Sequence, residues 1–392
     1  MADDLEYGPA RADGEKDAVA EILCGAFNTT VEECGEWIDR AGIDQLRVIR
    51  PGGRVGGCLV LIPMGQWFGG RSVPMMGIAG VAIAPEHRGN RGAGGLMSSM
   101  LAEMYEKGQF LSTLYASTQP LYRRAGYEQA GTTFDILLAT SQIDIRDRDL
   151  SVRPIGPEDD PAVAACYRQW AMRHDGSLDR RDYIWRRIRT PRKNTARGYL
   201  VEGPSGVEGF LYYMQVEAKG GRYSLKLTDV TSVTRSAARR LLTFLADHRS
   251  MAFRVQWQGG PADTLLTMLR EQRSRMRLWE YWMLRIVDVA GALEARGYSA
   301  DRGARVHFEV RDDVIPQNNG RFVLEVSDGR GKVSRGGDGR VGIDVRGLAA
   351  MYTGHWTAEQ LRGRDYLEAS AEDASAASAV FAGHAPFMSD RF

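Results

Sequence analysis

The segment from Val81 to Met97 (VAIAPEHRGNRGAGGLM) constrains the fold more than any other stretch of the chain. It begins with apolar residues of the kind found in strands, passes a proline, becomes rich in glycine and arginine, and ends in apolar residues. Apolar residues then recur at the spacing of one helix face, at Leu96, Met97, Met100, Leu101 and Met104. The segment therefore predicts a strand joined to a helix by a glycine-rich loop.

A glycine-rich loop at the start of a helix is suited to bind an anion. Unpaired backbone N–H groups point out of the first helical turn, and the helix dipole favours negative charge there. Small residues let phosphate oxygens approach the backbone, and Arg88 and Arg91 can add charge-assisted contacts. We therefore predict a phosphate or pyrophosphate ligand. A glycine-rich turn that binds nothing is the alternative.

Two common phosphate-binding loops do not fit this segment. The dinucleotide pattern GxGxxG follows the first strand of its unit, whereas here the strand comes late in its domain and Pro-x-x-Arg precedes the glycines. The Walker loop needs GK[ST], which the segment lacks. The ligand is therefore expected to be held by another kind of phosphate loop.

The length of 392 residues predicts two or three domains. The first contains a predicted helix at 18–27 and predicted strands at 55–62, 75–83 and 110–116, by their apolar spacing and their turn signals.

The chain then partly repeats itself. After a polar seam near 140–149, residues 153–167 resemble the segment near the start of the chain, but the second copy lacks the glycine-rich loop. A third segment opens at about 284–298 and continues with alternating strands separated by turns. It predicts an α+β domain.

Composition indicates a soluble globular protein, with 43% hydrophobic and 26% charged residues and a net charge of +1. We therefore expect neither nucleic acid nor a membrane as a partner. No apolar run reaches the roughly 18 residues of a membrane helix, and the charged N-terminus does not resemble a signal peptide. The cysteines show no metal-binding spacing, which predicts reduced thiols, no bound metal and a cytoplasmic protein; they are Cys24, Cys34, Cys58 and Cys166.

The glycine-rich segment resembles motif A of the GCN5-related N-acetyltransferases (GNAT), in which a strand, (Q/R)xxGx(G/A) and a helix hold the pyrophosphate of acetyl-coenzyme A. The stretch LYASTQPLYRRAGYEQAG at 114–131 is similar to the companion segment of that family. The three-part layout, the junction RIVDVAGALEARGY and the terminal Phe392 resemble the Eis (enhanced intracellular survival) subfamily.

This resemblance implies an α+β fold with mixed α/β sheets, built from tandem acetyltransferase folds and a sterol-carrier-protein-like domain. Its predicted boundaries are 1–148 for the acetyl-CoA-binding domain, 149–285 for a degenerate copy and 286–392 for the third domain. Relatives form hexamers, so a homo-oligomer, and specifically a hexamer, is expected.

The implied activity is transfer of an acetyl group from acetyl-CoA to a primary amine of a small molecule or peptide, by direct attack in a ternary complex. A ping-pong route would need a nucleophile, and nothing marks Cys58, the nearest candidate, as activated. The alternative is a lipid-binding or hydrophobic-ligand-binding protein with a vestigial acetyltransferase site.

The resemblance assigns acetyl-CoA to three stretches. The first is the strand Val81, Ala82 and Ile83, through its backbone N–H groups. Ser117 and Thr118 line the pantetheine. The family pattern has glycine where this chain has Arg91, so Arg91 either contacts phosphate or crowds the site. The third stretch is the glycine-rich loop, in which the implied binding residues are Arg88, Gly89, Asn90, Arg91, Gly92, Ala93 and Gly94.

Tyr122 matches the general acid of the family, since a phenol with an ordinary pKa near 10 is protonated at neutral pH. Packing at a helix start is the alternative. The α-carboxylate of Phe392, with a reference pKa of about 3.3–3.7, is the implied base and would act through a water. A frayed terminus is the alternative.

The acceptor pocket is implied at Phe27 and Trp37, for which core packing is an equal alternative. Tyr127 is expected to pack under the sheet, and His87 to be an ordinary loop residue. Arg391 stands where an acid would favour cationic acceptors, which argues against aminoglycosides.

Overall fold

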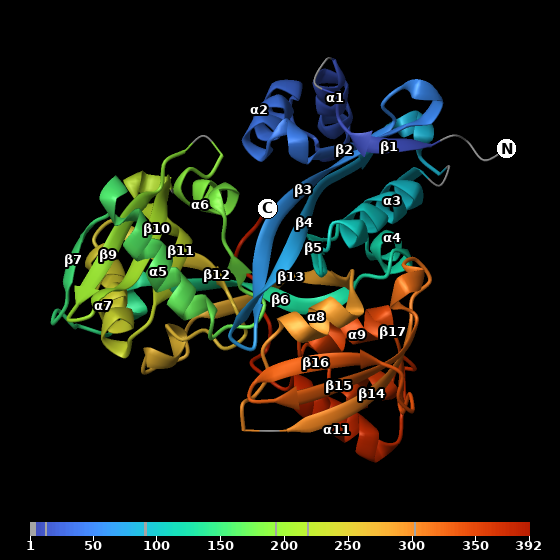
Figure 1. The fold of residues 1–392 in the computed structure, drawn as a ribbon. Coiled ribbons are helices and arrows are strands. Elements are labelled where there is room, and N and C mark those ends of the chain that lie inside the picture. Colours follow the sequence, from blue (N-terminus) through green and yellow to red (C-terminus); the bar gives the residue numbers. More distant parts are fainter. Residues whose placement is uncertain (1–4, 12–13, 90–91, 193, 218, 302) are drawn as a thin grey trace.

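The computed structural model describes residues 5–11, 14–89, 92–192, 194–217, 219–301 and 303–392. Over these residues the strands form two sheets, one of 13 strands and one of five (Figure 1). The larger sheet runs through the N-terminal and middle parts of the chain, and the smaller one belongs to the C-terminal part.

The N-terminal part confirms the predicted strand, loop and helix, with α3 ending just before Gly108, which has a φ of 66°. Its elements are β1 (Glu6–Pro9), α1 (Glu15–Phe27), α2 (Val31–Ala41), β2 (Leu46–Arg50), β3 (Gly57–Phe68), β4 (Arg71–Ile83), α3 (Gly92–Glu106), β5 (Leu111–Tyr115), α4 (Gln119–Arg124) and β6 (Glu128–Ala139).

The strand predicted at 55–62 is longer than expected, because β3 continues through Pro63 to Phe68. β2 pairs with β3 only as far as Val60, so the proline nitrogen removes no hydrogen bond between these two strands.

The middle part repeats the start of the chain, since β7 and α5 follow one another as β1 and α1 do. Its elements are β7 (Ser151–Pro154), α5 (Asp160–Ala171), β8 (Leu178–Asp179), α6 (Asp182–Arg189), β9 (Arg197–Gly203), β10 (Gly206–Glu217), β11 (Tyr223–Ser232), α7 (Arg235–Asp247), β12 (Ala252–Gly259) and β13 (Arg275–Ile286).

The C-terminal part is the predicted α+β unit, with helices packed on the five-stranded sheet. Its elements are α8 (Val289–Ala295), β14 (Ala304–Arg311), β15 (Gly320–Ser327), β16 (Arg330–Arg335), β17 (Val341–Asp344), α9 (Val345–Tyr352), α10 (Ala358–Arg362), β18 (Leu367–Glu368) and α11 (Ala371–Phe381).

The first two parts share their sheet. β13 lies between β5 and β6 and is antiparallel to both, while β6 also pairs with β12. A strand from residues 275–286 therefore completes the N-terminal sheet. The predicted boundaries at 148 and 285 stay a prediction, because the sheet runs on across the first of them.

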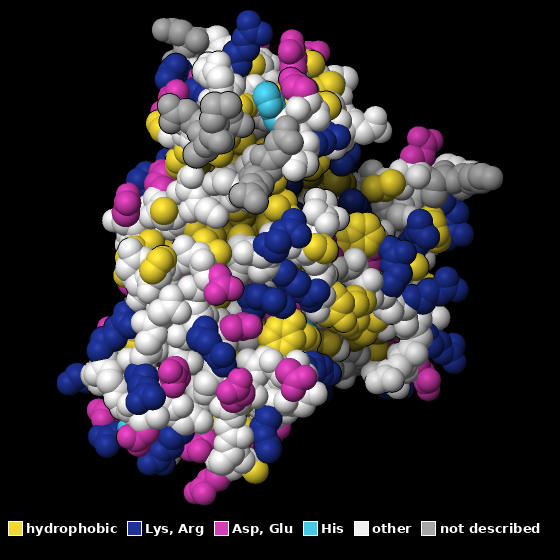
Figure 2. Space-filling model, turned by 90° about the vertical axis from the view of Figure 1, so that its right-hand side faces the viewer, with side chains coloured by type: hydrophobic (Ala, Val, Ile, Leu, Met, Phe, Trp, Pro, Cys, Tyr) yellow, Lys and Arg dark blue, Asp and Glu magenta, His cyan; other side chains and the backbone are white. Residues whose placement is uncertain are grey.

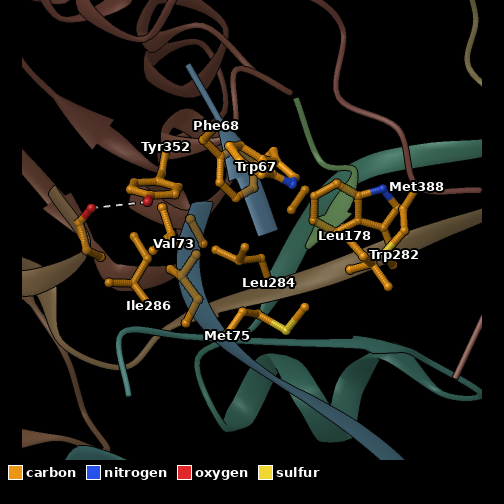
Figure 3. Packing of buried hydrophobic residues seen from close by; sticks show 14 of the residues in the cluster. Trp67, Phe68, Val73, Met75, Leu178, Trp282, Leu284, Ile286, Tyr352 and Met388 are labelled. Carbon is orange, nitrogen blue, oxygen red and sulfur yellow. Dashed lines mark hydrogen bonds between the residues drawn. The ribbon is translucent and has the colours of Figure 1, made fainter. Parts of the chain in front are cut away.

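One hydrophobic cluster joins all three parts (Figure 3). Trp67 of β3 and Trp282 of β13 lie in it with Tyr352 of α9 and Met388 of the C-terminal tail. The Tyr352 hydroxyl donates a hydrogen bond to the carbonyl of Ala292 at 3.1 Å. This shared core fixes the third part against the first.

The C-terminal tail, residues 382–392, leaves the third part and ends beside β3, between the N-terminal and middle parts (Figure 1). It follows β6: the Thr132 N–H donates to the Pro386 carbonyl at 3.2 Å, and the Met388 N–H donates to the Thr132 carbonyl at 3.3 Å. The Thr133 hydroxyl donates to the Met388 carbonyl at 2.7 Å.

Acidic and basic side chains are interspersed over the lower part of the face shown in Figure 2, and apolar side chains gather across its middle. No helix among the described residues is long and apolar enough to cross a membrane.

Candidate active site

The strands β4 and β5 part in the middle of the N-terminal sheet. They pair in parallel from Met75 opposite Leu111 to Ile78 opposite Leu114. β5 ends at Tyr115, whereas β4 continues to Ile83. On the β5 side, this last stretch of β4 has no partner strand among the described residues, and it contains the predicted binding residues Val81, Ala82 and Ile83.

A β-bulge lies at the start of this free stretch. The register between β3 and β4 shifts by one residue between Cys58 and Val60, and Gly80 has a φ of 60°. A Cβ on Gly80 would lie 2.7 Å from the Trp37 ring. Bulges redirect the backbone N–H groups of a strand and are common beside active sites.

The glycine-rich loop follows β4 and is open at its backbone. The Arg88 side chain is exposed, and its Nε donates to the Ile83 carbonyl at 3.2 Å. A Cβ on Gly89 or Gly94 would meet no atom within 4 Å, so a ligand can approach both. Gly92, which is buried, and Ala93, which is half-buried, begin α3; Asn90 and Arg91 lie outside the described residues.

Tyr122 lies on α4, directly after β5, and is buried on the face of the sheet that carries α3. Burial raises the pKa of Tyr122 to about 12, although a hydrogen bond with Ser117 opposes the shift. Ser117 and Thr118 are exposed between β5 and α4. Tyr127 is fully buried and hydrogen-bonded to the Ser112 hydroxyl at 2.6 Å, which confirms its packing role.

Phe392 approaches the point where β4 and β5 separate, but from the face of the sheet opposite to Tyr122. A Cβ on Gly77 would lie 2.9 Å from its ring, and the ring centroid is 5.6 Å from that of Tyr115. Neighbouring strand residues point to opposite faces, and Ile78 and Leu114 pack in the cluster that contains Tyr122. Tyr122 and Phe392 therefore approach the gap between β4 and β5 from opposite sides.

The tail that carries Phe392 is held by side chains along its length. Asp390 is buried and accepts two hydrogen bonds from Arg180 at 2.9 Å, and Arg180 also binds Asp229 of β11. The Tyr115 hydroxyl donates to the Asp390 carbonyl, and Arg187 Nε donates to the Arg391 carbonyl at 2.9 Å. The terminus is therefore bound and not frayed.

A cavity of about 1130 Å³ opens on the face of the sheet where Phe392 lies. Phe27, Trp37 and Phe392 all line it, so the structure brings together the two predicted pocket residues and the terminal residue. The Phe27 side chain is 51% exposed, and the Trp37 indole N–H donates to the Tyr183 hydroxyl at 3.0 Å. Neither residue is simply a core residue. Tyr122 does not line the cavity.

The sequence did not reveal how much of this cavity belongs to the middle part. Arg180, Asp229 and α6 lie in the copy that lacks the glycine-rich loop, so no motif marked them. The one available signal was the basic run DYIWRRIR at 182–189. His87 does not line the cavity, as expected, and no group of metal ligands occurs among the residues described.

Comparisons with known proteins find a match for each of the three parts of the chain. An acetyltransferase (GNAT) domain model matches residues 9–130, a second one matches 176–286, and a sterol carrier protein domain model matches 289–389. A solved GCN5-related N-acetyltransferase from Anabaena variabilis is 35% identical, with a TM-score of 0.94 over 99% of this chain and 100% of its own. The chain belongs to the GCN5-related N-acetyltransferase family.

Two further relatives agree with this placement. The N-acetyltransferase Eis of Mycobacterium tuberculosis is 29% identical over 87% of this chain and 85% of its own. A GCN5-related N-acetyltransferase from Kribbella flavida is 26% identical, with a TM-score of 0.85 over 100% of this chain and 99% of its own. The protein is an Eis-like N-acetyltransferase with tandem GNAT domains and a sterol carrier domain, as the sequence predicted.

Proposed function

We propose that this enzyme transfers the acetyl group of acetyl-CoA to a primary amine in a ternary complex, with Tyr122 as the acid and the α-carboxylate of Phe392 as the base. The observation that carries the proposal is the approach of these two residues to the parting of β4 and β5 from opposite faces. A thioester lying in that gap would meet its acceptor on the Phe392 side.

The donor site is supported by the backbone of β4 and the loop. The free stretch of β4 offers N–H groups to the pantetheine and the thioester oxygen, and a preorganised donor to such an oxygen is worth about 10²–10³ in rate. The start of α3 offers its own unpaired N–H groups to the pyrophosphate. The residues assigned to the donor are those named from the sequence, Arg91 included.

In the proposed step, the acceptor nitrogen forms a bond to the carbonyl carbon and the carbon–sulfur bond breaks. The nitrogen's proton goes to the Phe392 carboxylate through a water, and the sulfur receives its proton from Tyr122. Because the pKa of Tyr122 is near 12, its phenol is protonated at neutral pH before the reaction, and its hydrogen bond to the charge developing on sulfur precedes the transfer of that proton.

A covalent acetyl-cysteine route is not favoured. Cys58 is fully buried, and burial raises the pKa of its thiol to about 12, so almost no thiolate forms at neutral pH. This supports direct attack by the amine.

A lipid-binding function for the third part is not favoured either. A pocket of about 430 Å³ in the third part is lined mainly by charged and polar side chains, among them Arg305, His307, Asp338 and Arg340. Its core is filled by aromatic residues such as Phe308 and Phe322. The hexamer and the cytoplasmic location that the resemblance implies stay predictions.

The test measures thiol release from acetyl-CoA with a panel of aminoglycosides, polyamines, amino acids and lysine peptides. Tyr122→Phe and a variant with two residues appended after Phe392 are both expected to lose most of the rate with an accepted amine. Tyr223→Phe and the same two residues added before Met1 are the matched controls. An extended variant with full activity would remove Phe392 from the mechanism.

A further inference from the structure

One face of α6 points into the acceptor cavity. Tyr183, Arg186 and Arg187 stand at positions i, i+3 and i+4 and all line the cavity, where the buried side chains of Ile184 and Ile188 add an apolar part to the same lining. Both arginine side chains are exposed. Arg187 Nε bonds the Arg391 carbonyl at 2.9 Å, one residue before the proposed base, so this face adjoins Phe392.

Every carboxylate side chain that lines the cavity already has a partner. Two are bound by Arg180, at Asp229 and Asp390. The others pair with side chains or backbone outside α6: Glu33 with Thr29, Glu36 with Arg40, Asp135 with Arg277, and Asp263 with Trp257 and the Leu265 N–H. None of them offers its charge freely to a cationic acceptor.

The cations of the same lining are not balanced in this way. Arg40 and Arg391 have carboxylate partners, in Glu36 and Glu280. Within the part of the chain that is described, four others have no carboxylate within ion-pair distance: Arg186, Arg187, Arg192 and Lys226. The cavity therefore holds positive charge next to Phe392, which would repel a polycation and attract an anion.

We propose that the acceptor carries a carboxylate or phosphate group in addition to its amine, and that Arg186 and Arg187 bind that group while the amine faces Phe392. This inference rests on the proposed acetyltransferase function. A guanidinium presents several N–H donors in one plane, which suits both oxyanions. The acceptor would be a zwitterionic small molecule of the amino-acid or phospho-amine class, not a polyamine.

The test compares amines that differ only by the anionic group: lysine against cadaverine for the carboxylate, and phosphoethanolamine against ethanolamine for the phosphate. We expect kcat/KM to favour the anionic member of at least one pair by about tenfold or more at low salt, the effect of one charge-assisted hydrogen bond. The pair that shows the preference identifies the group. Added salt should reduce it.

Arg186→Gln is the cleaner variant, because Arg187 also holds the tail. It should abolish most of the preference by raising KM for the anionic amine, whereas KM for the partner amine that lacks the anionic group should not rise. Arg235→Gln, on the exposed surface of α7 outside the cavity, is the control and should leave the preference unchanged.

Calorimetric titration of lysine, cadaverine and phosphoethanolamine onto the full chain separates the two proposals. Tighter binding of an anionic amine, weakened by Arg186→Gln, supports the inference even if no acetyl transfer occurs, in which case the proposed function alone fails. Turnover or binding that favours cadaverine and ethanolamine overturns the inference and leaves the acetyltransferase proposal standing. A preference that Arg186→Gln does not change also overturns it.

Discussion

The anchoring of the tail by Arg180 can be tested with two substitutions that affect stability differently. The Arg180 guanidinium bridges Asp229 and Asp390, and the side chains are 1%, 5% and 4% exposed. Arg180→Met leaves two buried carboxylates without their cation. Asp390→Asn leaves Arg180 still paired with Asp229 and weakens only its bond to the tail.

The expected magnitudes follow from burial. Removing one partner of a buried ion pair costs about 3–5 kcal/mol, because an uncompensated charge stays in the interior. Arg180→Met should therefore lower the free energy of unfolding by about that amount. Asp390→Asn keeps a polar partner for the guanidinium and removes a charge, so its cost should be about 1 kcal/mol, that of one weakened hydrogen bond.

The assay pairs urea unfolding with steady-state acetyl transfer at a temperature where both variants are folded. Both should lower kcat by about tenfold or more, because a base displaced by about 1 Å loses that much or more. Acetyl-CoA binding should be unchanged, since neither Arg180 nor Asp390 belongs to the proposed donor site. Asp247→Asn, which breaks the exposed pair with Arg148, is the matched control.

Comparing the two variants distinguishes a role of Arg180 in folding alone from a role in holding the tail in place. If Asp390→Asn is stable and fully active, Arg180 has only a folding role and the tail needs no anchor. If Arg180→Met unfolds like the native protein, the buried cluster is not the strong constraint that its burial indicates.

Further substitutions test three points. These are the gap between β4 and β5 in which the thioester is proposed to lie, the proposal that no acetyl-cysteine forms, and the contact between the first and third parts of the chain. Gly80→Ala places a side chain against Trp37 at a residue whose φ is 60°. We therefore expect the acetyl-transfer rate to fall at least about tenfold and the free energy of unfolding to fall by about 1–2 kcal/mol. Gly25→Ala is the control, because a Cβ on Gly25 meets no atom within 4 Å, and it should change neither quantity adversely. Cys58→Ala should keep its activity, and mass spectrometry after alkylation at pH 8 should find Cys58 unmodified in the folded protein. Burial raises the pKa of Glu128, but hydrogen bonds from Arg123, the Gln129 N–H and Arg346 outweigh it, so the pKa is lowered. That stabilisation is present above the unfolded pKa of about 4.3 and is lost as pH falls through the folded pKa. Melting curves should therefore show Glu128→Gln less stable than the native protein at pH 7, with the difference shrinking below about pH 4; a constant difference would contradict the assignment.

Local features of the fold could be predicted because they depend on neighbours in sequence. The apolar spacing from Leu96 to Met104 places α3, and the glycine-rich loop places its start, without any knowledge of the rest of the chain. The strand predicted at 55–62 is shorter than β3, which continues past Pro63; whether a proline is tolerated there depends on where β2 stops pairing, which is a property of the sheet.

Long-range features left no comparable signal. β13 has the strand pattern that any sheet strand has, and nothing in residues 275–286 indicates that it inserts between β5 and β6. Arg180 and Asp390 are separated by 210 residues, and their pairing depends on the path of the tail. Phe392 was found by family resemblance, and the residues that hold it were not.

The middle part therefore contributes to the structure of the cavity although it lacks the glycine-rich loop. It supplies β13 to the N-terminal sheet, α6 to the cavity that Phe392 lines, and Arg180 and Asp229 to the binding of the tail. The third part supplies the tail itself, which crosses β6 to reach the gap between β4 and β5. Because the cavity is assembled from all three parts, a fragment ending at residue 148 would keep the glycine-rich loop but lack β13, α6 and Phe392, so the acceptor side proposed for the site needs the other two parts.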